Sequence, residues 1–328
     1  GRTGRLLPLQ RRGEETPERQ AAAASPGPLT PTASRLTGEL LARCTFPRSP
    51  QAVECAFSGG ADSSALVALA VSAGLDVTAH HVNHRSRPES DDEAIAAEQI
   101  AARLGAAFVS SVAPVEPGPN FEARARAVRR AVLEPDVLTG HTADDQAETL
   151  LLALLRGSGA TGLSAMTAGP PHPLLGLRRH ETHALCAALE IEPVDDPSNT
   201  DPRFRRNRVR HEVLPLLGEI AERDVVALAT RSADLLGADD RLLNELAAAI
   251  DATDAIALSG APLPLARRAV RSWLSVDGYP PDAAAIARVL DVAAGRSLAC
   301  EVAGVGRIRR SRQRLRIESD RTIGAHFP

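Results

Sequence analysis

Short apolar runs alternate with helix-like runs between residues 52 and 157, and this alternation constrains the fold more than any other feature. The apolar runs are AVECAF (52–57), LDVTAHHVNH (75–84), AAFVSSVAPV (106–115) and DVLTGH (136–141), and the helix-like runs are 63–73, 90–105, 120–133 and 144–157. Repeated βα units of this length predict a parallel sheet with helices on both faces. We therefore expect a doubly wound α/β domain, in which ligands bind at the carboxyl ends of the strands.

The pattern changes on both sides of this region, which predicts three segments. Residues 1–36 are rich in Arg, Ala, Pro and Glu without periodicity, and we expect a disordered or non-native extension. Residues 37–217 would form the α/β domain. In residues 218–328, Ala/Leu-rich runs at 219–250 and 264–294 predict helices and 297–318 predicts two short strands. This last segment is expected to be a second, mainly helical domain.

The composition excludes several classes of enzyme. All 38 basic residues other than histidine are arginines, so the chemistry of Walker-type ATPases, protein kinases and pyridoxal enzymes, which needs a lysine, is ruled out. The four cysteines are widely spaced and form no CxxC pair, which argues against a zinc ribbon or dithiol chemistry. No secretory signal or long apolar run is recognisable, so we expect a cytoplasmic protein without a membrane partner.

The stretch AFSGGADSSAL (56–66) lies where the first expected strand gives way to its helix. Its glycines allow backbone N–H groups to form a concave nest, and the N-terminus of the helix favours an anion. Asp62 would repel a phosphate unless a Mg²⁺ ion lay between them. The stretch predicts a site for nucleotide phosphates with a metal at Asp62, although an ordinary glycine turn capped by Asp62 or Ser63 has the same residues.

The sequence SGGADS (58–63) resembles the SGGxDS PP-loop of the N-type ATP pyrophosphatases. Those enzymes cleave ATP between the α and β phosphates and use AMP to activate an oxygen. The resemblance implies that ATP and Mg²⁺ are used here. The residues that it assigns to the nucleotide are Ser58, Gly59, Gly60, Ala61, Asp62 and Ser63.

Further stretches resemble the tRNA(Ile)-lysidine synthetase family. They are HVNH (81–84), GHTADDQAETLLLALLRGSGATGL (140–163), PLL (173–175) and DDPSNTDPRFRRNRVRHEVLPLL (195–217). The family activity implied is adenylation of the C2 oxygen of a cytidine in the CAU anticodon of an isoleucine tRNA. The ε-amino group of free lysine then displaces AMP, so the implied partners are this tRNA and lysine.

Three acids at the start of one expected helix suit this chemistry, because an ammonium ion must be held and deprotonated before it attacks. They are Asp144, Asp145 and Glu148. Acids in a first turn also stabilise a helix, and Thr142 with Asp145 fits a capping box. We expect at least one of the three to have a substrate or metal role, and which acid acts as the base stays open.

The remaining candidates come from matched motifs. His84 and His141 end expected strands, and a nucleotide-binding role is weighed evenly against a structural one. The resemblance implies catalytic roles for Asp62, Asp144, Asp145 and Arg206, and substrate binding by Glu148, Asn199, Asn207 and Arg210. Asn199 also lies in a turn-prone cluster, and a run of arginines is ordinarily a solvated face.

Near the end of the chain, six arginines between residues 307 and 316 predict a surface for tRNA phosphates, because alternate residues of a strand share a face. Aromatic residues make up 2% of the chain, so an extended base-stacking platform is not expected.

The chain also departs from the family pattern. Arg85-Ser86 stands where Gly-Leu is usual, and His172 stands where an arginine commonly precedes PLL. Two rival functions stay open: another PP-loop ligase or thiolase acting on tRNA or an amide acceptor, and a non-catalytic tRNA-binding protein. The oligomeric state is not predicted.

Overall fold

The computed structural model describes residues 29–85, 90–115, 121–195, 197–276 and 280–318. The chain divides into two compact units, Gly1–Ser158 with Ala165–Ala233, and Gly159–Ser164 with Asp234–Pro328. Of the expected extension (residues 1–36), residues 1–28 lie outside the described residues. Its last residues belong to helix α1 (Pro31–Leu41), whose Ala33 and Leu40 are buried. The expected boundary at 217/218 stays a prediction, since the two units divide within a helix further along.

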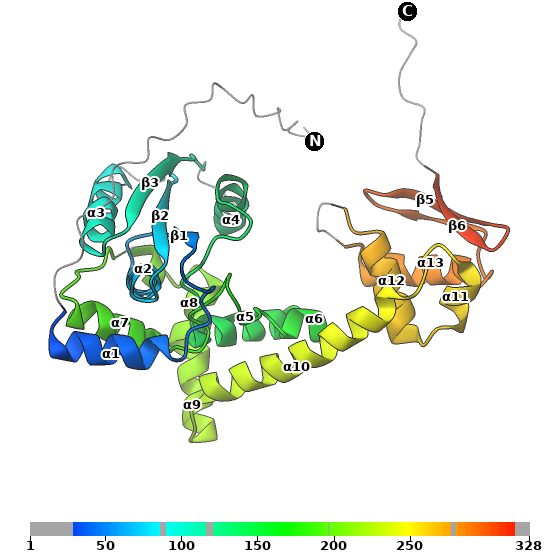
Figure 1. The fold of residues 1–328 in the computed structure, drawn as a ribbon. Coiled ribbons are helices and arrows are strands. Elements are labelled where there is room, and N and C mark those ends of the chain that lie inside the picture. Colours follow the sequence, from blue (N-terminus) through cyan, green and yellow to red (C-terminus); the bar gives the residue numbers. More distant parts are fainter. Residues whose placement is uncertain (1–28, 86–89, 116–120, 196, 277–279, 319–328) are drawn as a thin grey trace, which may run out of the picture. The chain divides into compact units, whose positions relative to one another are not determined.

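The first unit has a parallel sheet in the order β1-β2-β3, formed by Ala52–Ala56, Asp76–Asn83 and Ala107–Val112. The register pairs Cys55 with Ala79 and His80 with Val109. Helices α3 (Ser90–Arg103) and α4 (Phe121–Val132) lie on opposite sides of the sheet (Figure 1). This confirms the doubly wound α/β fold.

The fourth expected strand, 136–141, is reduced to one bridge. Leu138 pairs in parallel with Cys55, donates its N–H to Glu54 O at 2.8 Å, and accepts from Ala56 N at 2.8 Å. The sheet order therefore reverses at β1: β2 and β3 lie on one side of it and Leu138 on the other. Such a reversal is where open α/β sheets bind ligands.

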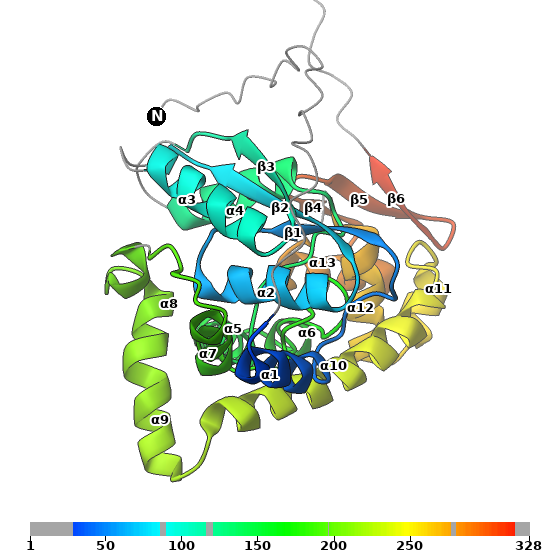
Figure 2. The same cartoon turned by 60° about the vertical axis from the view of Figure 1, so that its left-hand side comes forward.

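Helix α2 (Ala61–Ser72) is the central helix of this unit. It lies between the sheet and the pair α1 and α7 (Arg179–Ala188) (Figure 2). Its apolar residues are buried all round, which explains why its sequence has no polar face. Its N-cap is Gly60, and no side chain caps it, so the expectation that Asp62 or Ser63 would be the cap is wrong.

Further helices complete the unit: α5 (Ala143–Leu155), the 3₁₀ turn η1 (Pro197–Thr200), α8 (Arg205–Arg208) and α9 (Leu214–Ala221). A π-helical turn, η2 (Val209–Val213), joins α8 to α9. Single π turns inside helical runs are frequent at functional sites. Here the turn carries Arg210.

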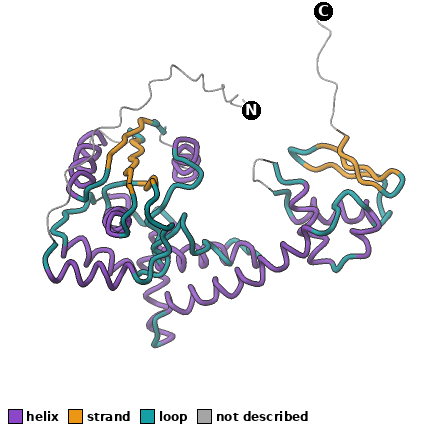
Figure 3. The backbone as a smooth tube through the Cα atoms, in the orientation of Figure 1, coloured by secondary structure: helices purple, strands orange, loops and turns teal. Residues whose placement is uncertain are grey.

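The second unit has helices packed on a small antiparallel sheet, whose strands are orange in Figure 3. The helices are α6 (Ala160–Leu163), α11 (Ala255–Gly260), α12 (Leu263–Trp273) and α13 (Ala283–Ala293). The strands are β4 (Ala299–Val302), β5 (Gly306–Ser311) and β6 (Arg314–Glu318). The helical expectation is thus confirmed, but there are three strands where two were expected. The 24-residue helix α10 (Val225–Ala248) contains the division between the units.

None of the helices in the described ranges is both long enough and apolar enough to cross a membrane.

Candidate functional site

The loop after β1 forms a compact nest closed by its own serines. Ser58 and Ser63 contact each other through their hydroxyls at 3.1 Å, and Ser63 donates to Gly60 O at 2.9 Å. Gly60 N donates to Ser58 Oγ at 3.3 Å. Gly59 has a φ of +79°, in the left-handed region that favours glycine. The geometry agrees with the predicted phosphate-binding loop at the start of a helix.

A second segment approaches this loop so closely that it requires a glycine. A Cβ on Gly140 would lie 2.7 Å from Asp62 O and 3.1 Å from Ser63 N. Both atoms belong to backbone, which cannot move aside as a flexible side chain would. The GH of the 140–163 motif thus brings His141 and α5 directly against the nest.

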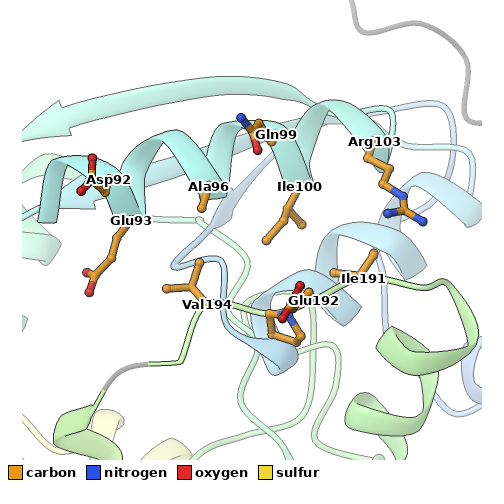
Figure 4. Close-up of a pocket in the computed structure, with 10 residues that line it drawn as sticks. Asp92, Glu93, Ala96, Gln99, Ile100, Arg103, Ile191, Glu192 and Val194 are labelled. Atoms are coloured by element: carbon orange, nitrogen blue, oxygen red, sulfur yellow. The ribbon is translucent and has the colours of Figure 1, made fainter. Parts of the chain in front are cut away.

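A groove of about 740 Å³ lies on another side of the loop, between α3 and residues 191–194 (Figure 4). Asp92 and Glu93 line one end and Arg103 the other. Val194 belongs to both features, because its N–H donates to Gly59 O at 3.0 Å. Val194 therefore connects the groove to the loop. The carboxylates described next are not among the residues that line the groove.

Three carboxylates meet three guanidinium groups beside the nest. Glu148, on α5, is fully buried, and its oxygens contact Arg179 at 3.0 Å, Arg206 at 2.6 Å and Arg210 at 2.7 Å. Asp145 Oδ1 contacts Arg179 at 2.9 Å and Arg206 at 3.0 Å. The motif acids and the RNxxR arginines, distant in sequence, therefore form one cluster, which we call the ion cluster (Asp62, Asp145, Glu148, Arg179, Arg206, Arg210).

Asp62 joins the loop to this cluster. Its Oδ2 lies 3.5 Å from Arg179 Nε, and its Oδ1 accepts a short hydrogen bond from the fully buried hydroxyl of Thr182. Arg179 and Thr182 both lie on α7, and neither was predicted as a site residue. The signal that could have indicated them is the arginine pair 178–179 preceding a helix shortly after PLL.

The pKa values separate the two aspartates of the cluster. Burial would raise the pKa of Asp145, but Arg179 and Arg206 outweigh it and hold that pKa at about 2. Burial and the neighbouring charge of Asp145 raise the pKa of Asp62, despite the hydrogen bond from Thr182 and the charge of Arg179. Asp62 is thus the carboxylate that would gain most from additional positive charge.

Asp145 has both of the roles that its sequence position allowed, stabilising the start of a helix and taking part in the site. Its Oδ2 accepts from the N–H of Thr142 at 2.9 Å and from the Thr142 hydroxyl at 3.0 Å, as a first-turn acid does. Its Oδ1 faces the arginines of the ion cluster. One carboxylate therefore stabilises the helix start and takes part in the site.

Asp144 makes different contacts from its neighbour. Its oxygens accept from Arg178 Nε at 3.1 Å and from the backbone N–H of Arg179 at 2.8 Å. Burial acts against these contacts, but they lower the pKa of Asp144. Asp144 thereby fixes the start of α7 against the start of α5, and its predicted catalytic role stays a prediction.

The two candidate histidines are both held by hydrogen bonds. His84 donates from Nδ1 to Ala113 O at 3.0 Å, and burial lowers its pKa, so its ring is neutral at pH 7. His141 Nδ1 bonds the hydroxyl of Thr139 at 2.8 Å, and His172 packs edge-on against it at 5.2 Å. His172, which replaces the arginine usual in the family, therefore helps to hold the ring of His141 in place. Nucleotide binding by His84 and His141 stays a prediction.

The two candidate asparagines contact residues outside the ion cluster. The buried Asn207 donates from its amide to Asp201 O at 2.9 Å, which ties α8 to the preceding loop. The side chain of Asn199 is exposed in η1, and its carbonyl contacts His211 Nε2 at 3.4 Å. Ser86, one of the positions at which this chain differs from the family pattern, lies outside the described residues.

Metal and thiol chemistry have few candidates here. Among the described residues, no three His, Cys, Asp or Glu side chains are arranged to hold a metal ion. The four cysteines are all free, and burial raises the pKa of Cys55 and Cys44 to about 12 and of Cys186 to about 11. These thiols are protonated at neutral pH and therefore poor nucleophiles.

The second unit carries a basic surface on the outer face of its sheet. Cross-strand pairs share a face, and they place Arg309 opposite Arg316 and Arg307 opposite Glu318. Arg310 lies on the inner face and donates to Ala293 O at 2.7 Å. Arg309 also lies 3.7 Å from Glu318. Like charges directly opposite each other destabilise a sheet, so the pair Arg309–Arg316 favours a role in binding an anion.

Comparison with known proteins agrees with both units. Residues 31–217 match the PP-loop domain family, and residues 254–316 match the TilS substrate binding domain. A tRNA(Ile)-lysidine synthase of Nocardia farcinica is 43% identical over 250 residues, which cover 71% of this chain and 78% of that protein. One of Rhodococcus erythropolis is 44% identical over 243 residues, 69% and 74% of the two chains.

The chain belongs to the tRNA(Ile)-lysidine synthase family. Members of its PP-loop superfamily use ATP, and binding of ATP at the nest after β1 stays a prediction. Among solved structures, the U34-tRNA thiolase NcsA from Methanococcus maripaludis has a TM-score of 0.50 and 15% identity, covering 63% of this chain and 78% of that one. At this identity the likeness shows the shared PP-loop fold alone.

The two family matches cover the residues of the ion cluster and of the basic sheet face. The PP-loop match ends at residue 217, so it includes both RNxxR arginines of the ion cluster. The substrate-binding match begins at residue 254 and includes β4, β5 and most of β6, with its basic outer face.

Proposed function

We propose that this protein ligates free lysine to C2 of the wobble cytidine in the CAU anticodon of an isoleucine tRNA. In the first step the C2 oxygen of the cytidine attacks the α phosphorus of ATP, and pyrophosphate leaves. In the second step the ε-amino group of lysine attacks C2, and AMP leaves with the oxygen. The observation that carries this proposal is the ion cluster, which joins a phosphate-binding loop to buried carboxylates through Arg179.

The loop would bind the ATP phosphates during the first step. Gly59, Gly60 and Ala61 present backbone at the start of α2, where N–H groups and the helix dipole favour negative charge. Ser58 and Ser63 would exchange their mutual hydrogen bond for bonds to phosphate oxygens. Arginines of the ion cluster are suited to the leaving pyrophosphate, since a guanidinium binds phosphate bidentately.

A Mg²⁺ ion would fit at Asp62. The raised pKa of this partly buried carboxyl means that its charge is incompletely compensated, and oxygen ligands suit magnesium. Because the described residues offer no cluster of three protein ligands, phosphate oxygens and water would complete the shell. The ion would supply charge neutralisation at the phosphates.

In the second step the carboxylates would hold the lysine ammonium. Glu148 and Asp145 lie in the same helix turn, and Asp145 is charged at neutral pH, given its pKa of about 2. Asp145 is too weak a base to take the proton and would act through its charge. Arg206 and Arg210 have the chemistry to bind the lysine carboxylate.

The basic face of the second unit would position the tRNA. Arg307, Arg309 and Arg316 are exposed on adjacent strands, as suits contacts with a phosphate backbone. A thiolation reaction is disfavoured, because the free cysteines are scattered over both units and all four thiols have raised pKa values.

The test separates catalysis from binding with the variant Asp62→Asn. We expect it to bind the isoleucine tRNA as the wild type does and to lose tRNA-dependent release of AMP and pyrophosphate by at least about 100-fold, the scale of one removed electrostatic contact in a closed site. The matched control is Glu39→Gln, an exposed acid on α1 that pairs only with Arg35 in the described structure. AMP release by Asp62→Asn at the wild-type rate would contradict the proposal.

A further inference from the structure

The ion cluster has no spare negative charge. Three carboxylates (Asp62, Asp145, Glu148) face three guanidinium groups (Arg179, Arg206, Arg210). The oxygens of the fully buried Glu148 are both occupied, Oε1 by Arg179 and Arg210 and Oε2 by Arg206 and Arg210. A lysine ammonium brought to this cluster would be a fourth cation among three anions, next to the fully buried Glu148. In the described state the cluster is therefore closed to lysine.

Arg179 differs from the other two arginines in what it joins. It lies 2.9 Å from Asp145, 3.0 Å from Glu148 and 3.5 Å from Asp62, so it bridges α5 and the loop. Among the ion pairs of the described residues, Arg206 and Arg210 reach only the two acids on α5. The contact of Arg179 with Asp62 is also its longest, and about a fifth of its side chain is exposed.

A nucleotide at the loop would change the charge balance at Arg179 first. The triphosphate adds several negative charges next to Asp62, and a metal ion on Asp62 would replace the positive charge that Arg179 supplies there. A guanidinium binds phosphate oxygens in a fork geometry with charge-assisted hydrogen bonds. A movement of the side chain toward the loop would remove one guanidinium group from Asp145 Oδ1 and from Glu148 Oε1, which keep their contacts with Arg206 and Arg210. Three carboxylates would then face two guanidinium groups.

We propose that Arg179 is a positioning residue that closes the lysine site until ATP binds, and that its transfer to the nucleotide phosphates opens Asp145 and Glu148 to the lysine ammonium. This inference rests on the proposed function. It makes binding ordered, with ATP before lysine. Because coupling between two sites is reciprocal, lysine raises the affinity for ATP by the same factor.

The order of binding has a chemical consequence. An amine held beside the loop before the nucleotide arrives would have no activated cytidine to attack. Closing the cluster in the absence of ATP gives the buried side chains of Glu148 and Asp145 arginine partners rather than water. Arg206 and Arg210 keep their contacts with these acids after Arg179 leaves.

The experiment measures lysine binding by calorimetry, with and without Mg²⁺ and an ATP analogue that cannot be cleaved between the α and β phosphates. For the wild type we expect the analogue to raise lysine affinity at least about tenfold, within the usual range of coupling between sites. For Arg179→Gln we expect lysine to bind without the analogue, and the analogue to change its affinity less than about twofold, because little coupling is left.

The matched control is Arg208→Gln. Arg208 lies in the same helical run as Arg206, is exposed, and pairs with Glu212 outside the cluster. It should retain the wild-type coupling. If Arg179→Gln does not fold, Arg179→Lys replaces it: a single ammonium cannot contact three acids at once, so its coupling should fall below that of the wild type.

Equal lysine affinity with and without the analogue in the wild type would overturn the proposal and leave the proposed function intact. Full wild-type coupling in Arg179→Gln or Arg179→Lys would overturn it as well. No lysine binding in any state, with analogue binding retained, would contradict the proposed function itself.

Discussion

At the scale of single residues, the site depends on one carboxylate that is both buried and strongly compensated. Asp145 keeps its charge because Arg179 and Arg206 overcome the cost of its burial. Asp62 has only one guanidinium contact and a hydroxyl, and burial leaves its pKa raised. The two acids therefore affect stability in opposite directions as the pH falls, which provides a way to observe the cluster without substrate.

The first prediction concerns this pH dependence. With a pKa of about 2 in the folded state, Asp145 contributes stability that is fully present above its unfolded pKa of about 4 and is lost as the pH falls toward 2. The contribution corresponds to about 2 kcal/mol. We expect the amide protection factors of α5 to fall between pH 5 and pH 3 in the wild type.

The variant Asp145→Asn serves as the reference. Burial raises the pKa of Asp62 in both proteins, and the variant lacks the further increase that the Asp145 charge causes. Its α5 protection should be lower at pH 6 and should approach that of the wild type at about pH 2, where half of the wild-type carboxyl groups are protonated. A constant difference between the two proteins across this range would contradict the assignment.

At the scale of elements, the site exists because two chain segments approach each other without side chains between them. The loop after β1 and the segment after Leu138 lie on either side of the point where the sheet order reverses. Gly140 allows the second segment to touch the backbone of α2. This contact places α5, and with it Asp145 and Glu148, beside the nest.

The second prediction follows from that contact. Gly140→Ala should destabilise the first unit by about 1–3 kcal/mol, the usual cost of overpacking, and should weaken binding of an ATP analogue. The control is Gly38→Ala on α1, where a Cβ meets nothing within 4 Å and helix propensity should rise. Chemical unfolding and analogue affinity measure the two effects. Unchanged stability and affinity in Gly140→Ala would show that the close approach is unimportant.

The elements also show what the sequence could predict and why the rest was missed. The loop, α5 and the RNxxR arginines each have local patterns, and the structure brings Asp62, Asp145, Glu148, Arg206 and Arg210 together as one cluster. Arg179 and Thr182 were missed because the arginine pair 178–179 does not indicate a partner, and Asp62 lies 117 and 120 residues away from them. Only the tertiary fold of α7 against α2 creates these contacts.

The differences in strand number have local causes. Pairing of the fourth expected strand is limited to Leu138, because Gly140 turns toward the loop rather than continuing along β1. The third strand of the second unit follows a turn at Arg312 and Gln313, which have φ values of 47° and 64°. Such turns ordinarily have Gly, Asn or Asp, and two long side chains gave no sign of one.

At the scale of the whole molecule, each unit presents a different chemistry. In the first unit, buried acids neutralise the charges of the arginines in the ion cluster. The second exposes arginines on one sheet face, where Arg309 and Arg316 stand directly opposite each other. The net charge of −3 therefore conceals a local basic surface.

The third prediction tests this surface. Replacing Arg309 and Arg316 together by serine should weaken tRNA binding and reduce the slope of log affinity against log salt by about 2, one per lost phosphate contact. ATP-analogue binding should be unchanged. The control is Arg296→Ser, an exposed arginine outside the sheet that pairs with Asp291. Wild-type tRNA affinity and salt slope in the double variant would exclude this face from tRNA binding.

The most direct measurement of the central claim is the transfer of labelled free lysine to an isoleucine tRNA transcript with a CAU anticodon. The reaction contains ATP and Mg²⁺, and the methionine tRNA with the same anticodon is the control. The account predicts label on the isoleucine tRNA alone, with one AMP and one pyrophosphate released for each lysine joined. Pyrophosphate release without lysine on the tRNA, or equal labelling of the methionine tRNA, would contradict it.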